Sequence, residues 1–283
     1  MPVNLVKKSV GNIFQAMKNS PKGTFEIVLA NDVMNMLHCK QIKASNTRKA
    51  DIKVVVYDSI TPTTPELGFS IKSMLGSPST LFNASGITNF IYKVVNKEQK
   101  EEVNSIDGTS KVMDRTKSTY NSGGNLFFLE VENENLRKNL RKIDSNFSKI
   151  LAEILKYYYG GKASRLVDLV ECIGNDKNFC EKIGLDKSDF EFKIKNFLSA
   201  VALGMTPKKE WDGFTKAHGG YIIVKENGEV VCYHLYNRDE FEEYLYRNTK
   251  LDTPSTTRHK FGEIYEERGE KRIKYNLQVR FIK

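Results

Sequence analysis

Apolar residues at the start of the chain recur at helical spacing. Over residues 3–19 they fall every three or four positions, and Pro21 follows, which predicts one helix there and a second over residues 30–39. After a polar stretch at residues 43–49 the pattern changes to the short apolar runs typical of strands. Strands are predicted over residues 52–57, 67–73, 89–95 and 126–131. The first half of the chain is therefore expected to mix helices and strands.

The spacing changes again after residue 132, to a helical period that continues to the pair Gly160-Gly161. This pattern predicts one long helix, which the two glycines end. Further helices are expected over residues 164–173, 187–203 and 239–247. A hairpin is predicted around Asn227-Gly228, because both residues accept the positive φ of a tight turn. A second hairpin is predicted between residues 264–267 and 272–281.

These elements predict an α/β fold of the α+β kind, with a mixed central sheet flanked by helices and a C-terminal region of helix and β-hairpin. We divide the chain into a core over residues 1–131, a helical region over 132–210 and a hairpin-rich region over 211–283. The alternative is that all three regions form one domain.

Composition restricts the class of protein. The chain of 283 residues is 40% hydrophobic, which is enough to bury a sizeable core, and its formal charge of +9 favours polyanionic partners such as nucleic acid. A ribosome-associated factor, or simply a low-GC genome whose proteins are rich in lysine, would give the same charge. No apolar stretch reaches the roughly 20 residues that span a membrane, so a cytoplasmic protein without membrane contact is expected. The four cysteines are expected to be reduced and buried.

Two of the predicted strands carry the candidate chemistry. If residues 52–57 and 67–72 pair antiparallel, alternation places their apolar side chains on one face, and this face is expected to join the core. The opposite face then collects Asp51, Ser70 and Lys72. A lysine is rarely tolerated inside a protein unless it is paired or used. The alternative is a purely structural role, in which Lys72 lies on a solvated face and Asp51 caps a strand.

An aspartate near a lysine suits phosphodiester hydrolysis. The Asp51 carboxylate can hold Mg²⁺, the carbonyl of Ile71 can supply another oxygen ligand, and Lys72 can orient water or stabilise the transition state. The arrangement resembles the PD-(D/E)xK nuclease core, in which an acid stands two positions before the lysine. Here that position is Ser70, so a second acid must come from elsewhere. Glu66 is preferred because it opens the strand, with Asp58 and Glu26 as alternatives.

Longer strings of residues add a more specific resemblance. The chain is similar to the HpaII-type type II restriction endonucleases over residues 49–52, 66–85, 88–90, 219–224, 234–238, 253–259 and 277–281. The resemblance implies a bacterial, Mg²⁺-dependent enzyme that cuts double-stranded DNA at a short palindrome, with CCGG as the site of the type enzyme. A palindrome is compatible with a homodimer or with a monomer.

The same resemblance leaves catalysis open. Members of this group usually begin with a longer N-terminal region that holds a Gly-Glu-Trp-Ser-Glu-like helix, whereas the one tryptophan of this chain is Trp211. If that helix lends an acid to the metal site, this chain either uses another acid or cleaves weakly. A nuclease-fold DNA-binding protein without catalysis is therefore the second hypothesis, and a basic RNA-associated factor is the third.

Two segments are candidate DNA contacts. Short polar side chains follow the lysine strand, where they suit phosphate contacts, although an ordinary capped loop would look the same. These residues are Ser77, Ser79, Thr80, Asn83 and Ser85. A second loop, in the region expected to recognise DNA, combines hydroxyls with basic groups at Thr256, Thr257, Arg258, His259 and Lys260. The Arg258 guanidinium can read guanine O6 and N7 together.

Overall fold

The computed structural model divides the chain into two compact units. It describes residues 3–19, 27–36, 50–55, 57, 59, 62–74, 78–95, 111–234 and 237–282. The first unit combines residues 1–79 with 216–235, and the second combines 80–215 with 236–283. The units do not follow the predicted boundaries at residues 131 and 210, because a hairpin from late in the chain returns to complete the first sheet.

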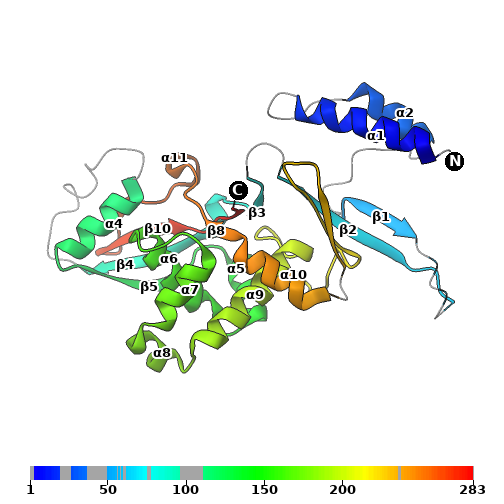
Figure 1. The fold of residues 1–283 in the computed structure, drawn as a ribbon. Coiled ribbons are helices and arrows are strands. Elements are labelled where there is room, and N and C mark those ends of the chain that lie inside the picture. Colours follow the sequence, from blue (N-terminus) through cyan, green and yellow to red (C-terminus); the bar gives the residue numbers. More distant parts are fainter. Residues whose placement is uncertain are drawn as a thin grey trace. The chain divides into compact units, whose positions relative to one another are not determined.

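The first unit contains a four-stranded mixed sheet (Figure 1). Its elements are α1 (Val3–Lys18), α2 (Val28–Met36), β1 (Ile52–Val55), β2 (Glu66–Ser73), β6 (Gly220–Val224) and β7 (Val230–His234). The strand order is β1-β2-β6-β7, in which β2 and β6 are parallel and the other neighbours are antiparallel. The mixed sheet that the sequence predicts is therefore confirmed.

Glycines allow the β6–β7 hairpin to close. The predicted hairpin forms, but only Gly228, with a φ of 84°, adopts a positive φ and Asn227 does not; the Gly228 N–H donates to the carbonyl of Lys225 at 3.0 Å. At the start of β6, Gly220 has a φ of 138°, and a Cβ there would collide with the carbonyl oxygen of Tyr233. Only glycine lets these two strands approach so closely.

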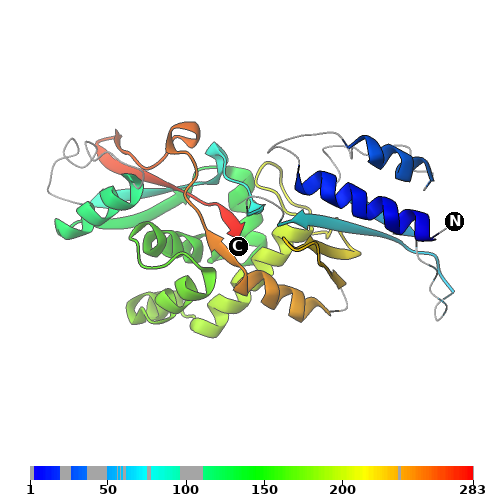
Figure 2. The ribbon, with the colours of Figure 1, turned by 45° about the horizontal axis from the view of Figure 1, so that its top comes forward.

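The second unit holds two antiparallel sheets, ordered β5-β4-β10-β9 and β3-β11-β8. The strands are β3 (Thr80–Phe82), β4 (Asn89–Val95), β5 (Asn125–Val131), β8 (Thr249–Leu251), β9 (Ile264–Glu267), β10 (Glu270–Asn276) and β11 (Val279–Phe281). The helices are α4 (Lys111–Asn121), α5 (Glu134–Ile143), α6 (Phe147–Tyr159), α7 (Leu166–Gly174), α8 (Lys177–Ile183), α9 (Lys187–Leu203), α10 (Arg238–Arg247) and α11 (Thr256–His259). Helix α6 packs on β5 and β10, and both ribbon views show α6, α7 and α9 on one side of the four-stranded sheet (Figures 1 and 2).

A cluster of tyrosines forms part of the core of the second unit. The ring of Tyr275 lies 4.9 Å from that of Tyr92 and 4.5 Å from that of Tyr159, and all three side chains are fully buried. A buried phenol hydroxyl usually has a hydrogen-bond partner. The Tyr92 hydroxyl donates to the carbonyl of Ala152 at 2.8 Å, and the Tyr159 hydroxyl donates to that of Asn276 at 2.9 Å. These contacts fix α6 on the sheet.

Two elements that the sequence predicts as continuous are divided in the structure. The prediction of one long helix is wrong, because α5 ends at Ile143 and α6 begins only at Phe147. Between the two helices, the Asp144 carboxylate accepts a hydrogen bond from the N–H of Asn146 at 2.8 Å. It also forms an ion pair with the Lys193 ammonium at 2.9 Å. The predicted strand over residues 272–281 is likewise split into β10 and β11, which belong to different sheets.

Two other expectations concern the cysteines and the membrane-spanning segments. Cys172, Cys180 and Cys232 are free thiols as expected, but none of the three is buried: Cys172 and Cys180 are half-buried and Cys232 is exposed. Cys39 lies outside the described residues. Among the helices that the structure describes, none is long and apolar enough to cross a bilayer.

Candidate active site

Strand pairing brings Asp51 beside the lysine strand. Ile52 lies opposite Phe69 in the antiparallel register, and the N–H of Asp51 donates to the Phe69 carbonyl at 2.7 Å. The Asp51 carboxylate then reaches past the end of β1, where its Oδ2 accepts the N–H of Ile71 at 2.7 Å and the hydroxyl of Ser70 at 3.3 Å. Asp51 therefore caps the hydrogen-bond ladder between β1 and β2, as the purely structural alternative expects. The same contacts hold its exposed carboxylate in a fixed position.

Lys72 lies on the drier face of the sheet. Its neighbour on β6 is Ile223, and the neighbour of Ser70 is Tyr221, and both β6 side chains are buried. Burial lowers the pKa of the Lys72 ammonium below its ordinary value, and the nearby charge of Asp51 acts in the opposite direction. The structure thus brings together Asp51, Ser70, Ile71 and Lys72.

The apolar face of β1 is not the core face. We expect Ile52 and Val54 to be buried with the apolar side chains of β2, but each is 40% exposed, whereas Ser70 on the opposite face is only 3% exposed. The neighbouring strand decides the burial: β6 contributes its own buried residues to the lysine face, and alternation within β1 and β2 carries no information about that strand.

Glu66 does not join the group. It shares the face of Ser70 but precedes it by four residues, which is about 13 Å along a strand. Its carboxylate forms an ion pair with Lys53, and its carbonyl accepts a hydrogen bond from the His218 ring at 2.8 Å. Glu26 and Asp58 lie outside the described residues. Within the described part of the chain, no three His, Cys, Asp or Glu side chains gather as a metal site.

The donor chemistry nevertheless fits Mg²⁺. This ion usually keeps several waters and binds through one or two carboxylates together with substrate phosphates. Asp51 presents one exposed carboxylate, of which Oδ2 is held by Ile71 and Ser70. The residues present therefore suit an ion that is completed by the substrate rather than one enclosed by protein.

The second candidate loop of the sequence contains a one-turn helix. Ser255 caps α11 by accepting the N–H of Arg258 at 3.3 Å, and Lys260, with a φ of 51°, ends it. The carbonyl of His259 accepts a hydrogen bond from the Asn89 amide at 3.2 Å, which ties α11 to β4. Burial, followed by the charge of Arg258, lowers the pKa of His259. Arg258 and Lys260 are left exposed.

A pocket of about 400 Å³ opens beside α11. It is lined by Thr256, Thr257, Lys260, Phe261, Glu263, Tyr265 and Lys274. The Lys274 ammonium lies 5.5 Å from the centre of the Tyr265 ring and pairs with Glu132 at 2.5 Å. The Tyr265 hydroxyl is buried and has no hydrogen-bond partner in the described structure. Sequence periodicity misses Tyr265 and Lys274, because only the pairing of β9 with β10 brings them to the same face.

The polar segment after β2 is mainly structural where it is described. Thr80 pairs with Arg280 in a sheet, and the N–H of Ser85 donates to the Thr88 hydroxyl at 3.1 Å in a capping box. This is the capped loop that the alternative expects. Asn83 is exposed, Ser79 is half-buried, and Ser77 lies outside the described residues.

Comparison with known proteins identifies the family. The model of the HpaII restriction endonuclease family matches residues 1–281. The chain is 40% identical to the type II restriction enzyme HpaII of Haemophilus parainfluenzae over 285 residues, which cover 100% of this chain and 79% of that protein. No solved structure matches the chain. Since both matches extend over almost the whole chain, it belongs to the HpaII restriction endonuclease family.

Proposed function

We propose that the chain hydrolyses phosphodiester bonds of double-stranded DNA at a short palindromic site, CCGG, with Mg²⁺ as its cofactor in the bacterial cytoplasm. The observation that carries the proposal is the Asp51 carboxylate, which Ile71 and Ser70 hold beside the partly desolvated Lys72 in a member of this family. A homodimer would match the two-fold symmetry of a palindrome.

Each residue of the group has a separate role in this proposal. Asp51 and the Ile71 carbonyl hold the Mg²⁺, which, when bound, lowers the pKa of water and offsets negative charge on the phosphate. Ser70 and the Ile71 N–H fix the carboxylate through the hydrogen bonds described above. Lys72 stabilises the charge of the transition state through its ammonium, whose electrostatic effect is stronger in a partly dry site.

The deciding experiment is cleavage of plasmid DNA in Mg²⁺, followed by sequencing of the fragment ends. Fragments that all end at one short palindrome are expected, and the ends also report the stagger. Specific binding without cutting in Mg²⁺, Mn²⁺ or Co²⁺ would favour the DNA-binding protein without catalysis. The observation that supports this second hypothesis is that no third acidic or metal-binding side chain joins the site among the described residues. Stronger binding of single-stranded RNA than of duplex DNA would favour the RNA-associated factor.

Replacement of Arg258 by Ala is expected to reduce discrimination between the cognate site and a scrambled duplex by about 1–3 kcal/mol, because an exposed guanidinium on α11 reads a guanine bidentately. Arg258→Lys is the matched variant. It keeps the charge but not the fork of donors, so it should lose the same discrimination and retain affinity for the scrambled duplex. Fluorescence anisotropy on both duplexes measures the difference. Equal losses on the two duplexes in Arg258→Ala would remove Arg258 from base recognition.

A further inference from the structure

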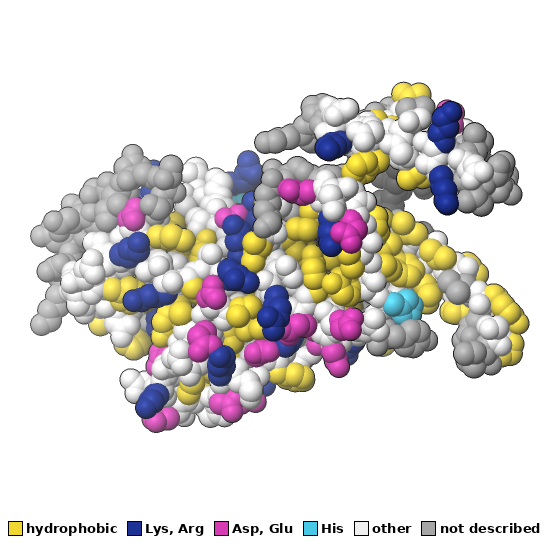
Figure 3. Space-filling model, viewed as in Figure 1, with side chains coloured by type: hydrophobic (Ala, Val, Ile, Leu, Met, Phe, Trp, Pro, Cys, Tyr) yellow, Lys and Arg dark blue, Asp and Glu magenta, His cyan; other side chains and the backbone are white. Residues whose placement is uncertain are grey.

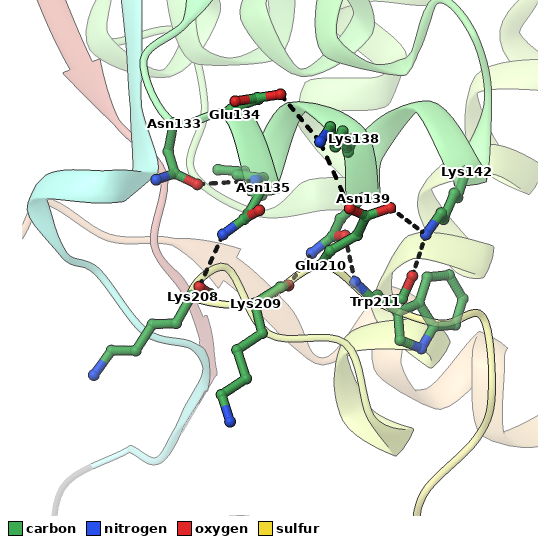
Figure 4. A network of polar contacts seen from close by, with 11 residues as sticks. Asn133, Glu134, Asn135, Lys138, Asn139, Lys142, Lys208, Lys209, Glu210 and Trp211 are labelled. Carbon is green, nitrogen blue, oxygen red and sulfur yellow. Dashed lines mark hydrogen bonds and ion pairs between the residues drawn. The ribbon is translucent and has the colours of Figure 1, made fainter.

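A loop without regular secondary structure is held along its length by helix α5. Residues 206–211, which we call the anchored loop, follow α9 and lie against Asn139, a fully buried side chain (Figure 4). The Asn139 amide nitrogen donates to the carbonyls of Thr206 at 3.0 Å and Lys209 at 2.8 Å. Its oxygen accepts the N–H of Trp211 at 2.7 Å. One amide group therefore fixes three backbone groups.

Three further side chains of α5 complete the attachment, and one of them, Lys138, pairs with Glu210 at 3.6 Å. Asn135 donates to the carbonyl of Lys208 at 3.2 Å, and Lys142 donates to the carbonyl of Trp211. Lys142 also pairs with Glu210 at 3.1 Å, and this contact is the main reason that the pKa of Glu210 is lowered. The carboxylate of the anchored loop is thus ionised and already neutralised by α5, so it offers no net negative charge to a ligand.

The two lysines of the loop are arranged differently. Figure 4 shows the side chains of Lys208 and Lys209 extending away from α5. Both are exposed, and neither ammonium has a partner among the residues that the structure describes. Elsewhere in the second unit many basic side chains are paired with acids, and Figure 3 shows the two signs of charge next to each other on the face it draws. Such pairs include Lys193 with Asp144, and Lys195 with Glu191 and Glu243.

We infer that the anchored loop is a preorganised contact for the phosphate backbone of DNA, with Lys208 and Lys209 as the binding groups and Asn139 as the residue that positions them. The inference rests on the proposed function for the identity of the ligand. Fixing the backbone in advance lowers the entropy lost on binding, and lysines act on phosphates as point charges. The loop adds affinity without sequence information, unlike Arg258.

The test compares two double variants in the full-length protein. Lys208→Ala/Lys209→Ala removes two charges from the anchored loop, and Lys177→Ala/Lys182→Ala removes two exposed lysines from α8 as a matched control. Binding to a cognate and to a random duplex is measured by anisotropy over about 50–200 mM salt. The loop variant should lower the slope of log K against log[salt] by about 1.8, equally on both duplexes, and its loss of affinity should be about tenfold greater at 50 than at 200 mM. The control should leave the slope unchanged.

A third variant separates positioning from charge. Asn139→Asp keeps the acceptor for Trp211 but loses both donors to the loop, so it should reduce the slope although both lysines remain. Circular dichroism checks that this variant is folded. Identical slopes for the two double variants would overturn the inference even if the wild type cuts DNA normally. If the wild type binds DNA but never cleaves it, the proposed function fails while the slopes still decide this inference.

Discussion

Asp51→Asn is expected to abolish DNA cleavage while the protein stays folded and still binds DNA. Asp51 is the carboxylate that the structure holds with Ile71 and Ser70, and an amide cannot bind Mg²⁺ as strongly as a carboxylate does. Loss of the metal's contribution should lower the rate by about 10³-fold, which corresponds to about 4 kcal/mol in the barrier. The side chain is exposed, and an asparagine oxygen can still accept the N–H of Ile71, so the change in stability should be small.

The measurement is single-turnover cleavage of a duplex that carries the site, with anisotropy for binding. Glu66→Gln and Asp32→Asn are matched controls, each of which removes one exposed acid from the first unit. Glu66→Gln should change the rate at most about fivefold, because its exposed ion pair with Lys53 is worth up to about 1 kcal/mol. A loss in Glu66→Gln as large as that in Asp51→Asn would show that Glu66 is a metal ligand after all. Normal cleavage by Asp51→Asn would refute the proposed site.

Much of the fold follows from local signals. The β6–β7 hairpin, the antiparallel pair β1–β2 and the bounds of α9 are all confirmed, because turn chemistry and apolar period act over a few residues. The break at Asp144 escapes periodicity, since apolar spacing continues across it and the polar cap interrupts only the backbone. Short polar elements such as α11, and the strands β3 and β8 of three residues, carry too little pattern to be recognised.

The site is predictable only within its own strands. Alternation and the spacing of Asp51 and Lys72 correctly place the two on one side of β2, where their charges interact. The burial of that side depends on β6, which lies about 150 residues later in the chain and pairs in parallel with β2. The pocket beside α11 depends in the same way on the pairing of β9 with β10. Long-range strand pairing is thus the part of the site that one sequence does not reveal.

Lys72→Met is expected to abolish most of the cleavage and, at neutral pH, to stabilise the protein. Methionine keeps the apolar stem but removes an ammonium that acts on the transition state, which should lower the rate by about 10²–10³-fold. The same ammonium is partly desolvated, which lowers its pKa, so the folded state holds the charge at a cost. Removal of this charge should increase the free energy of unfolding by about 1 kcal/mol.

The pH dependence distinguishes this effect from better packing. Because the folded protein releases the Lys72 proton at a lower pH than the unfolded chain does, the wild type should gain stability relative to Lys72→Met as the pH rises from the lowered folded pKa toward 10.5. Urea unfolding at neutral and at alkaline pH measures this, with Lys53→Met on the neighbouring strand as the control, since Lys53 is exposed and paired with Glu66. An advantage of Lys72→Met that does not shrink at alkaline pH would mean that desolvation of the charge is not its cause. Retention of full cleavage by Lys72→Met would show that Lys72 is only a structural residue of the sheet.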